Sequence, residues 1–175
     1  LAKIFAGIAI KLYWLSQPLV LFGWFINNFT RSGGLSEEFG WRGYLQEKFL
    51  RKFGLNWGLI LLGIIWGYWH LPMVLMGWSF PNHPILGALL LMPISTIFMG
   101  IFEGWIYLRS RSIWMPALAH ASINLFTGFL SLMSMPQDTL ISKLIFLLGW
   151  GIVAGFCIVS LNRNMFCETT LIFSL

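Results

Sequence analysis

Two adjacent glutamates carry the first sign of chemistry in this chain of 175 residues. Glu37 and Glu38 are followed by Arg42, and long apolar stretches flank the three residues on both sides. The chain has six acidic residues, and 58% of all its residues are hydrophobic. A carboxylate in apolar surroundings is costly unless it is paired, hydrated or functional. The adjacent pair is therefore the first place to expect a catalytic group.

The two glutamates are expected to have different roles. Glu38 and Arg42 are four residues apart with the acid first, which is the favourable order for an ion pair on one helix face. This spacing favours a supporting role for Glu38, with direct catalysis as the alternative. Neighbouring helical residues point about 100° apart, so Glu37 faces away from the predicted pair. We therefore predict that Glu37 is a general base.

Three further polar residues lie within apolar segments. His70 stands among aromatic residues and two positions before Pro72, so it is either a packing residue or, as we favour at membrane depth, a functional one. His120 and Asn124 are four residues apart and share a helix face, and the small residues around them leave room for a ligand. Their donors could together polarise a carbonyl, as an oxyanion hole requires.

Metal binding is left open by these residue types. Glu37, His70 and His120 could hold Zn²⁺, which accepts carboxylate and imidazole ligands. Glu37 and His70 could equally hold a water molecule without a metal, and the residue types alone do not decide between the two. No HExxH motif is present. Glu103 is expected to pair with an arginine or with a histidine of the site, mainly as a structural residue.

The elements that position these side chains are predicted to be membrane helices. A mean hydropathy of +0.78 and only 10% charged residues exclude an ordinary soluble domain, and several apolar runs approach the ~20 residues that span a bilayer. We predict an all-α, polytopic bundle of about five or six transmembrane helices, in a multi-pass integral membrane protein (of the plasma membrane if bacterial). The expected helical segments are 4–26 with a kink at Pro18, 35–53, 56–78, 85–108, 113–132 and 139–161.

Local signals refine this prediction. Residues 27–34 are polar and are expected to separate the first two helices, with Ser36 as the N-cap of the second. Pairs of glycines four residues apart predict close approach of helix backbones. These pairs are Gly54/Gly58, Gly63/Gly67, Gly100/Gly104 and Gly151/Gly155.

The net charge of +5 does not indicate a nucleic-acid partner, because the basic residues are spread over short segments between apolar runs. If every segment crosses the bilayer, most of the basic residues lie on one side of the membrane. An excess of lysine and arginine favours the cytoplasm for that side. These residues are Lys48, Arg51, Lys52, Arg109, Arg111 and Arg163, whereas Arg31 breaks the pattern. We expect a single membrane-embedded domain over residues 1–175, with a catalytic core at about 35–132. A start at Leu1 rather than methionine is compatible with a fragment that lacks upstream helices.

Three short motifs occur in a fixed order. They are Glu37-Glu38-x-x-x-Arg42, Trp66-x-x-x-His70 and His120-x-x-x-Asn124. In this order they resemble the motifs of the CAAX protease and bacteriocin-processing family of intramembrane proteases, which includes type II prenyl-protein proteases and the bacterial Abi proteins. The second motif of that family usually has phenylalanine where this chain has Trp66.

The resemblance implies a function for each residue. Glu37 and His70 would activate the attacking water, His120 and Asn124 would stabilise the oxyanion, and Glu38 with Arg42 would brace the helix. The family has been described both as metal-dependent and as a metal-independent glutamate-type protease, and the reaction without a metal is favoured, with Zn²⁺ as the alternative. The expected activity is hydrolysis of a peptide bond in a membrane-embedded or lipidated substrate, such as a prenylated protein, at the lipid bilayer. The alternatives are a non-catalytic bacteriocin-immunity or peptide-binding protein, and a small transporter or proton-coupled channel.

Overall fold

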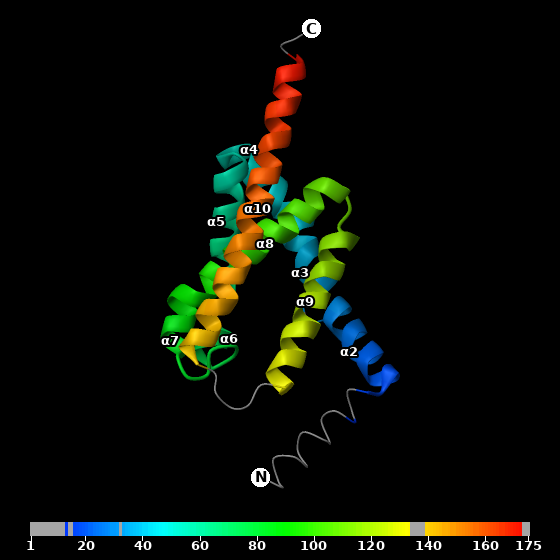
Figure 1. The fold of residues 1–175 in the computed structure, drawn as a ribbon, viewed down its shortest axis with the longest axis vertical. Coiled ribbons are helices and arrows are strands. Elements are labelled where there is room, and N and C mark those ends of the chain that lie inside the picture. The colour runs from blue at the N-terminus through cyan, green and yellow to red at the C-terminus, as the bar shows by residue number, and fades with distance from the viewer. Residues whose placement is uncertain (1–12, 14–15, 32, 134–138, 173–175) are drawn as a thin grey trace. The chain divides into compact units, whose positions relative to one another are not determined.

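The computed structural model describes residues 13, 16–31, 33–133 and 139–172, and the regular elements in this part of the chain are helices (Figure 1). The predicted all-α fold is confirmed. Contacts gather in two compact units. The first unit is Leu1–Gly40 with Ser112–Gln137, and the second is Trp41–Arg111 with Asp138–Leu175. A single domain over the whole chain stays a prediction.

The first unit contains three described helices, α2 (Pro18–Thr30), α3 (Gly34–Gly40) and α9 (Trp114–Met133). Helix α9 packs against both α2 and α3. The rings of Phe29 and Trp114 stack with their centroids 6.2 Å apart. A Cβ atom on Gly128 would lie 2.8 Å from the ring of Trp24, so the missing side chain admits that tryptophan.

Helix α2 differs from the sequence prediction at both ends. Pro18 stands at its start, where the fixed φ of proline suits a first helical position; most of the predicted segment 4–26 before it lies outside the described residues. At the other end α2 continues to Thr30, so the predicted break at residues 27–34 is too long. Asn28 and Thr30 donate side-chain hydrogen bonds to the carbonyls of Trp24 and Ile26 at 2.8 Å, which accommodates these polar residues within the helix.

The second unit is built around α8. Its elements are η1 (Trp41–Leu45, a π-helical turn), α4 (Gln46–Phe53), α5 (Leu55–Trp69), α6 (Leu71–Leu75), α7 (Pro84–Leu86), η2 (Gly87–Leu91, also π-helical), α8 (Met92–Ser110) and α10 (Leu140–Ile172). Helix α8 packs against α5 and α10 (Figure 1). One apolar cluster of this unit includes Leu59 of α5, Ile101 of α8 and Ala154 of α10. The predicted helices at 85–108 and 139–161 are confirmed.

The predicted helix at 56–78 is interrupted at His70, because α5 ends at Trp69 and the short helix α6 follows at Leu71–Leu75. The N–H of His70 bonds to the carbonyls of Gly67 and Tyr68, which tightens the last turn. Pro72 follows, and a proline at that position would disrupt a continuing helix. His70 therefore occupies a helix end rather than a helix interior.

Two glycines bring α5 and α8 into backbone contact. Cβ atoms on Gly63 and Gly67 would lie 2.5 Å from the Cα atoms of Ile97 and Pro93 respectively. The hydroxyl of Thr96 donates to the carbonyl of Gly63 at 2.8 Å. The predicted close approach is confirmed for this pair. It is wrong at Gly54 and Gly155, since no other group of the described chain lies within 4 Å of a Cβ there.

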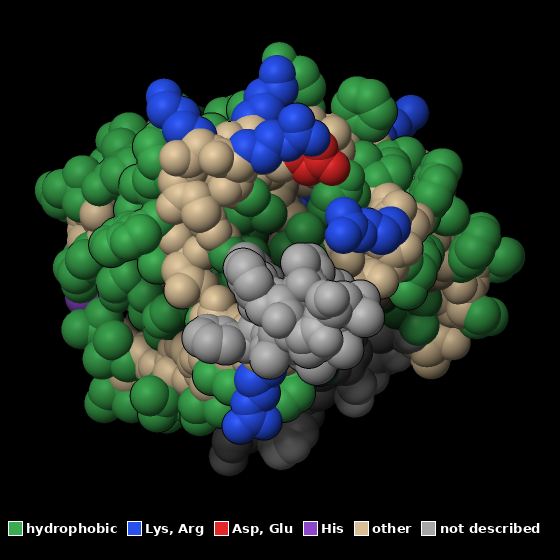
Figure 2. Space-filling view, turned by 90° about the horizontal axis from the view of Figure 1, so that it is seen from above, with side chains coloured by type: hydrophobic (Ala, Val, Ile, Leu, Met, Phe, Trp, Pro, Cys, Tyr) green, Lys and Arg blue, Asp and Glu red, His purple; other side chains and the backbone are tan. Residues whose placement is uncertain are grey.

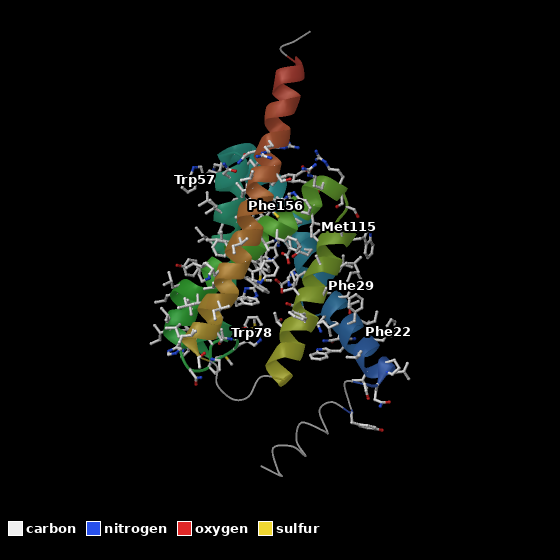
Figure 3. All side chains as sticks on the ribbon, viewed as in Figure 1. Phe22, Phe29, Trp57, Trp78, Met115 and Phe156 are labelled. Atoms are coloured by element: carbon white, nitrogen blue, oxygen red, sulfur yellow. The ribbon has the colours of Figure 1, made fainter. Side chains whose placement is uncertain are left out.

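Two helices of the described residues are long and apolar enough to cross a membrane, Pro84–Ser110 with 27 residues and Leu140–Arg163 with 24. Large apolar side chains also project outward from both units, among them Phe22, Trp57 and Phe156, which are 62%, 65% and 67% exposed (Figure 3). Lipid is the solvent in which such a surface is stable. These features indicate a membrane protein.

One end of the second unit is basic. Arg109 donates to the hydroxyl of Ser160 at 3.0 Å, and Asn162 donates to the side chain of Asn56 at 3.4 Å, so the end of α8, the start of α5 and residues 160–162 of α10 lie together. Figure 2 shows Lys and Arg side chains gathered on the face seen from above. In the same unit, a hydrogen bond with Lys48 of α4 lowers the pKa of the hydroxyl of Tyr44, which lies in η1.

Candidate functional site

Gly33 and Gly34 form the turn into α3 in the first unit. Gly33 has a φ of +113°, a conformation that favours glycine, and its carbonyl accepts the N–H of Glu37 at 3.1 Å. A Cβ on Gly34 would lie 2.6 Å and 2.8 Å from the carbonyl oxygens of Phe29 and Asn28. Helix α3 therefore begins at Gly34, and the prediction of Ser36 as its N-cap is wrong because Ser36 lies inside the helix.

Three of the four predicted catalytic side chains surround this turn. A Cβ built on Gly33 would lie 2.7 Å from Nε2 of His120, 3.0 Å from Nδ2 of Asn124 and 3.0 Å from Oε1 of Glu37. His120 and Asn124 occupy one face of α9, one turn apart, and α9 packs against α3. The packing of α3 on α9 thus brings a carboxylate, an imidazole and an amide to one side of Gly33.

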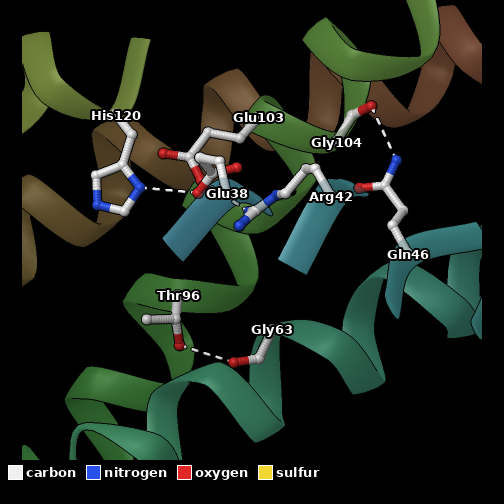
Figure 4. Close-up of polar contacts among 8 residues, drawn as sticks. All are labelled: Glu38, Arg42, Gln46, Gly63, Thr96, Glu103, Gly104 and His120. Atoms are coloured by element: carbon white, nitrogen blue, oxygen red, sulfur yellow. Dashed lines mark hydrogen bonds and ion pairs between the residues drawn. The ribbon is translucent and has the colours of Figure 1, made fainter. Parts of the chain in front are cut away.

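Glu38 approaches the other nitrogen of the same imidazole. Its Oε1 lies 2.8 Å from Nδ1 of His120, and both side chains are buried (Figure 4). Because an ionised carboxylate only accepts hydrogen bonds, Nδ1 of His120 carries the proton in this contact. Nε2 then accepts a hydrogen bond in the neutral ring and donates one in the imidazolium. Glu38 therefore fixes both the orientation and the tautomer of His120.

Arg42 is held within the second unit. Its Nη2 lies 2.7 Å from Oε2 of Glu103 on α8, and both side chains are buried. Its guanidinium also lies over the ring of Trp66, 4.8 Å from the centroid. One turn later, Gln46 donates to the carbonyl of Gly104 at 3.3 Å (Figure 4). The expected pairing of Glu103 with an arginine is confirmed, whereas a Glu38–Arg42 ion pair stays a prediction.

His70 also belongs to the second unit, where it caps the end of α5. Its Nδ1 lies 2.9 Å from the carbonyl of Trp66, so Nδ1 is the donor, and Nε2 is the acceptor nitrogen of the neutral ring. The ring stacks on Trp78 with a centroid distance of 5.5 Å and meets Trp69 edge-on at 4.9 Å. Aromatic packing and a defined tautomer occur together at this residue, and its catalytic role stays a prediction.

The residues beside Gly33 also suit a metal ion. Glu37 offers a carboxylate oxygen and His120 offers Nε2 on the same side of the turn, and Zn²⁺ accepts both ligand types. A carboxylate on the far nitrogen of a metal-binding histidine is a frequent outer partner, as Glu38 is here. The same contact would equally orient a histidine that acts without a metal.

Two features of this site were not predicted from the sequence. One is the contact between Glu38 and His120, which are 82 residues apart. The other is Gly33, for which the adjacent glycines at 33 and 34 were the available signal, since a glycine pair often marks a tight turn.

Comparisons with known proteins place these motifs in a family. The sequence model described as "Type II CAAX prenyl endopeptidase Rce1-like" matches residues 12–126, which include all six predicted site residues. The CAAX prenyl protease 2 of Methanococcus maripaludis is 31% identical over 170 residues, covering 84% of this chain and 60% of that protein. The chain thus spans less than two thirds of this relative, and no solved structure matches it. On the match to the family model, the chain belongs to the Rce1-like type II CAAX prenyl endopeptidases, a family of peptidases.

Proposed function

We propose that this protein is an intramembrane endopeptidase that hydrolyses a peptide bond in a lipidated or membrane-embedded substrate. The observation that carries the proposal is the convergence of Glu37, His120 and Asn124 beside Gly33. Family membership supports the reaction class, and the name of the Methanococcus relative supports a prenylated substrate. The fold we propose for the membrane is a polytopic bundle of about five or six helices, supported by the two long apolar helices and the shorter apolar helix α5.

Glu37 is the general base in the proposed reaction. Glu37 takes a proton from a water molecule, which His70 helps to hold through Nε2, while the water oxygen adds to the substrate carbonyl carbon. The carbonyl oxygen becomes negatively charged at this step. The proton then passes from Glu37 to the amine nitrogen as the carbon–nitrogen bond breaks, so that Glu37 is returned to its starting state.

His120 and Asn124 stabilise the negative oxygen. Nδ2 of Asn124 is a donor in every state, whereas Nε2 of His120 donates only when the ring is doubly protonated. The carboxylate of Glu38 on Nδ1 supplies the negative charge that balances such an imidazolium. Removing one oxyanion donor typically lowers kcat by about 10²–10³-fold.

The metal-dependent alternative uses the same residues. If Zn²⁺ is bound, Glu37, His70 and His120 would hold it, and the ion would polarise the substrate carbonyl as a Lewis acid. Elemental analysis of active protein before and after chelation distinguishes this alternative from the metal-free reaction.

The proposal is tested by cleavage of a farnesylated peptide that ends in a CAAX sequence, with the full chain reconstituted in lipid vesicles. We expect cleavage by the wild type and its loss in the Glu37→Gln variant. Glu47→Gln is the matched control, because Glu47 is an exposed glutamate on α4. Full cleavage by a correctly folded Glu37→Gln variant would exclude the proposed role of Glu37. Binding of the peptide by the wild type without any cleavage would favour the peptide-binding alternative.

A further inference from the structure

Gly33 forms one side of the candidate site with main-chain atoms alone. A Cβ there would lie at 2.7–3.0 Å from three polar atoms, those of Glu37, His120 and Asn124. Ordinary contacts of a carbon atom are about 3.5–4.0 Å, so a side chain at position 33 would displace these groups. It would also place a methyl group against a carboxylate, an imidazole and an amide, which must instead meet polar atoms of water and substrate.

The turn around Gly33 has little freedom to retreat. Gly34 lies directly against the main chain of Phe29 and Asn28, where a Cβ would come within 2.8 Å of three backbone atoms. The carbonyl of Gly33 is also bonded to the N–H of Glu37. A residue larger than glycine at position 33 is thus prevented from moving back toward α2.

The groups opposite Gly33 are also restrained. His120 is buried and its Nδ1 is bound by Glu38 at 2.8 Å, so its ring cannot turn away without losing this contact. Asn124 and Glu37 are half-buried and belong to α9 and α3, which pack on each other. The distance between Gly33 and these three side chains is therefore fixed both by the main chain at Gly33 and by the packing of the side chains.

We propose that Gly33 is a positioning residue of the peptidase reaction: its missing side chain keeps Glu37, His120 and Asn124 at their working positions and accessible to the scissile peptide group. This inference rests on the proposed function and adds to it a residue outside the three sequence motifs. The proposal concerns the space between Gly33 and these three side chains, which one added methyl group is sufficient to disturb.

Gly54 provides a matched control for the Gly33→Ala variant. Both glycines have positive φ, +113° and +75°, and both stand directly before a helix whose first hydrogen bond they accept. A Cβ on Gly54 would meet no atom within 4 Å, whereas a Cβ on Gly33 would meet the three site residues. Alanine therefore strains the backbone at both positions but crowds the candidate site at only one.

The first measurement is the kinetics of farnesylated-peptide cleavage by Gly33→Ala and Gly54→Ala. We expect Gly33→Ala to lower kcat by about 100-fold, the effect of a small misplacement of catalytic groups, with a smaller change in KM. Gly54→Ala should keep a kcat close to the wild-type value. Equal kcat values for the two variants would overturn the proposal.

The second measurement does not depend on activity. In a thermal-unfolding cycle, Gly33→Ala should lower Tm less in an Asn124→Ala background than in the wild type, because the crowded amide has been removed. The effect of Gly54→Ala on Tm should be the same in both backgrounds. Strictly additive effects for Gly33→Ala would overturn the proposed clearance while leaving the peptidase proposal intact. If the effects of Gly33→Ala and Asn124→Ala on Tm are not additive but the wild-type protein cleaves no peptide, the proposed function is contradicted instead.

Discussion

At the scale of single residues, the adjacent Glu37 and Glu38 occupy different surroundings. Glu37 is half-buried with Oε1 beside Gly33, whereas Glu38 is fully buried and bound to Nδ1 of His120. The rotation of about 100° between neighbours on a helix allows this division. One carboxylate is thus suited to act on a substrate and the other to orient a histidine.

Substitution of Glu38 should show whether this residue orients His120 or helps to bind the substrate. Glu38→Gln keeps the size of the side chain but removes the charge that balances an imidazolium at His120. We expect kcat to fall by about 10–100-fold, as for other partners that orient a functional histidine, with KM nearly unchanged. Steady-state kinetics on the farnesylated peptide measure this, with Glu47→Gln as the control. A rise in KM at constant kcat would show that Glu38 acts in substrate binding instead.

The sequence indicated candidate residues for the site but not the contacts among them. The shared face of His120 and Asn124 follows from a spacing of four residues within one helix, which is local information. The contact of Glu38 with His120 depends on how α3 packs against α9, and no local rule contains it. The same limit applies to Gly33, whose proposed role rests on side chains from both of those helices.

At the scale of elements, a buried ion pair connects η1 to α8. Arg42 and Glu103 are 1% and 0% exposed, and Gly100 lies beside the guanidinium, since a Cβ there would be in ordinary contact with Nη2 at 3.4 Å. The sequence predicted that Glu103 pairs with an arginine or with a histidine of the site, but it did not identify Arg42 as the partner. A second ion pair, between Glu47 and Arg51, lies at the exposed surface of α4 with N and O 3.3 Å apart.

These two ion pairs allow a controlled test of stability. Glu103→Gln should lower the free energy of unfolding by about 3–5 kcal/mol, because it leaves the charge of Arg42 buried without its counter-ion. Glu47→Gln should change the free energy of unfolding by no more than about 1 kcal/mol, as is usual for an exposed pair. Denaturation in detergent micelles measures both. Similar effects for the two variants would contradict a supporting role for the buried pair.

The helix ends show which features of the sequence were sufficient to predict where a helix begins and ends. The segment at 85–108 was predicted nearly to its ends, because a long apolar run defines it, whereas α10 continues to Ile172, well beyond the predicted end at 161. The end of α5 at Trp69 was missed, since it is set by a tightened turn at His70 and by the following Pro72. Such ends depend on backbone hydrogen bonds of one or two residues, which an apolar pattern does not reveal.

At the scale of the whole molecule, the basic residues favour one orientation in the membrane. Arg109 lies in the last turn of the apolar helix Pro84–Ser110 and Arg111 follows it directly, whereas Lys143 is the one basic residue of the described chain near the start of α10. At about 1.5 Å per residue, the 27 residues of that helix exceed the ~30 Å of a bilayer core. Its two ends are therefore expected on opposite sides, with the arginines in the cytoplasm.

Labelling with a membrane-impermeant maleimide tests this orientation in sealed vesicles. The parent chain carries Cys157→Ala and Cys167→Ser, and the two test variants add Ser110→Cys or His83→Cys at opposite ends of the helix. We expect the first variant to react only from the cytoplasmic side and the second only from the other side, because lysine and arginine next to a span are retained in the cytoplasm. The parent chain should show no labelling in either orientation. Reaction of both variants from one side would mean that Pro84–Ser110 does not cross the bilayer, and reaction from the reversed sides would mean that the basic end does not face the cytoplasm.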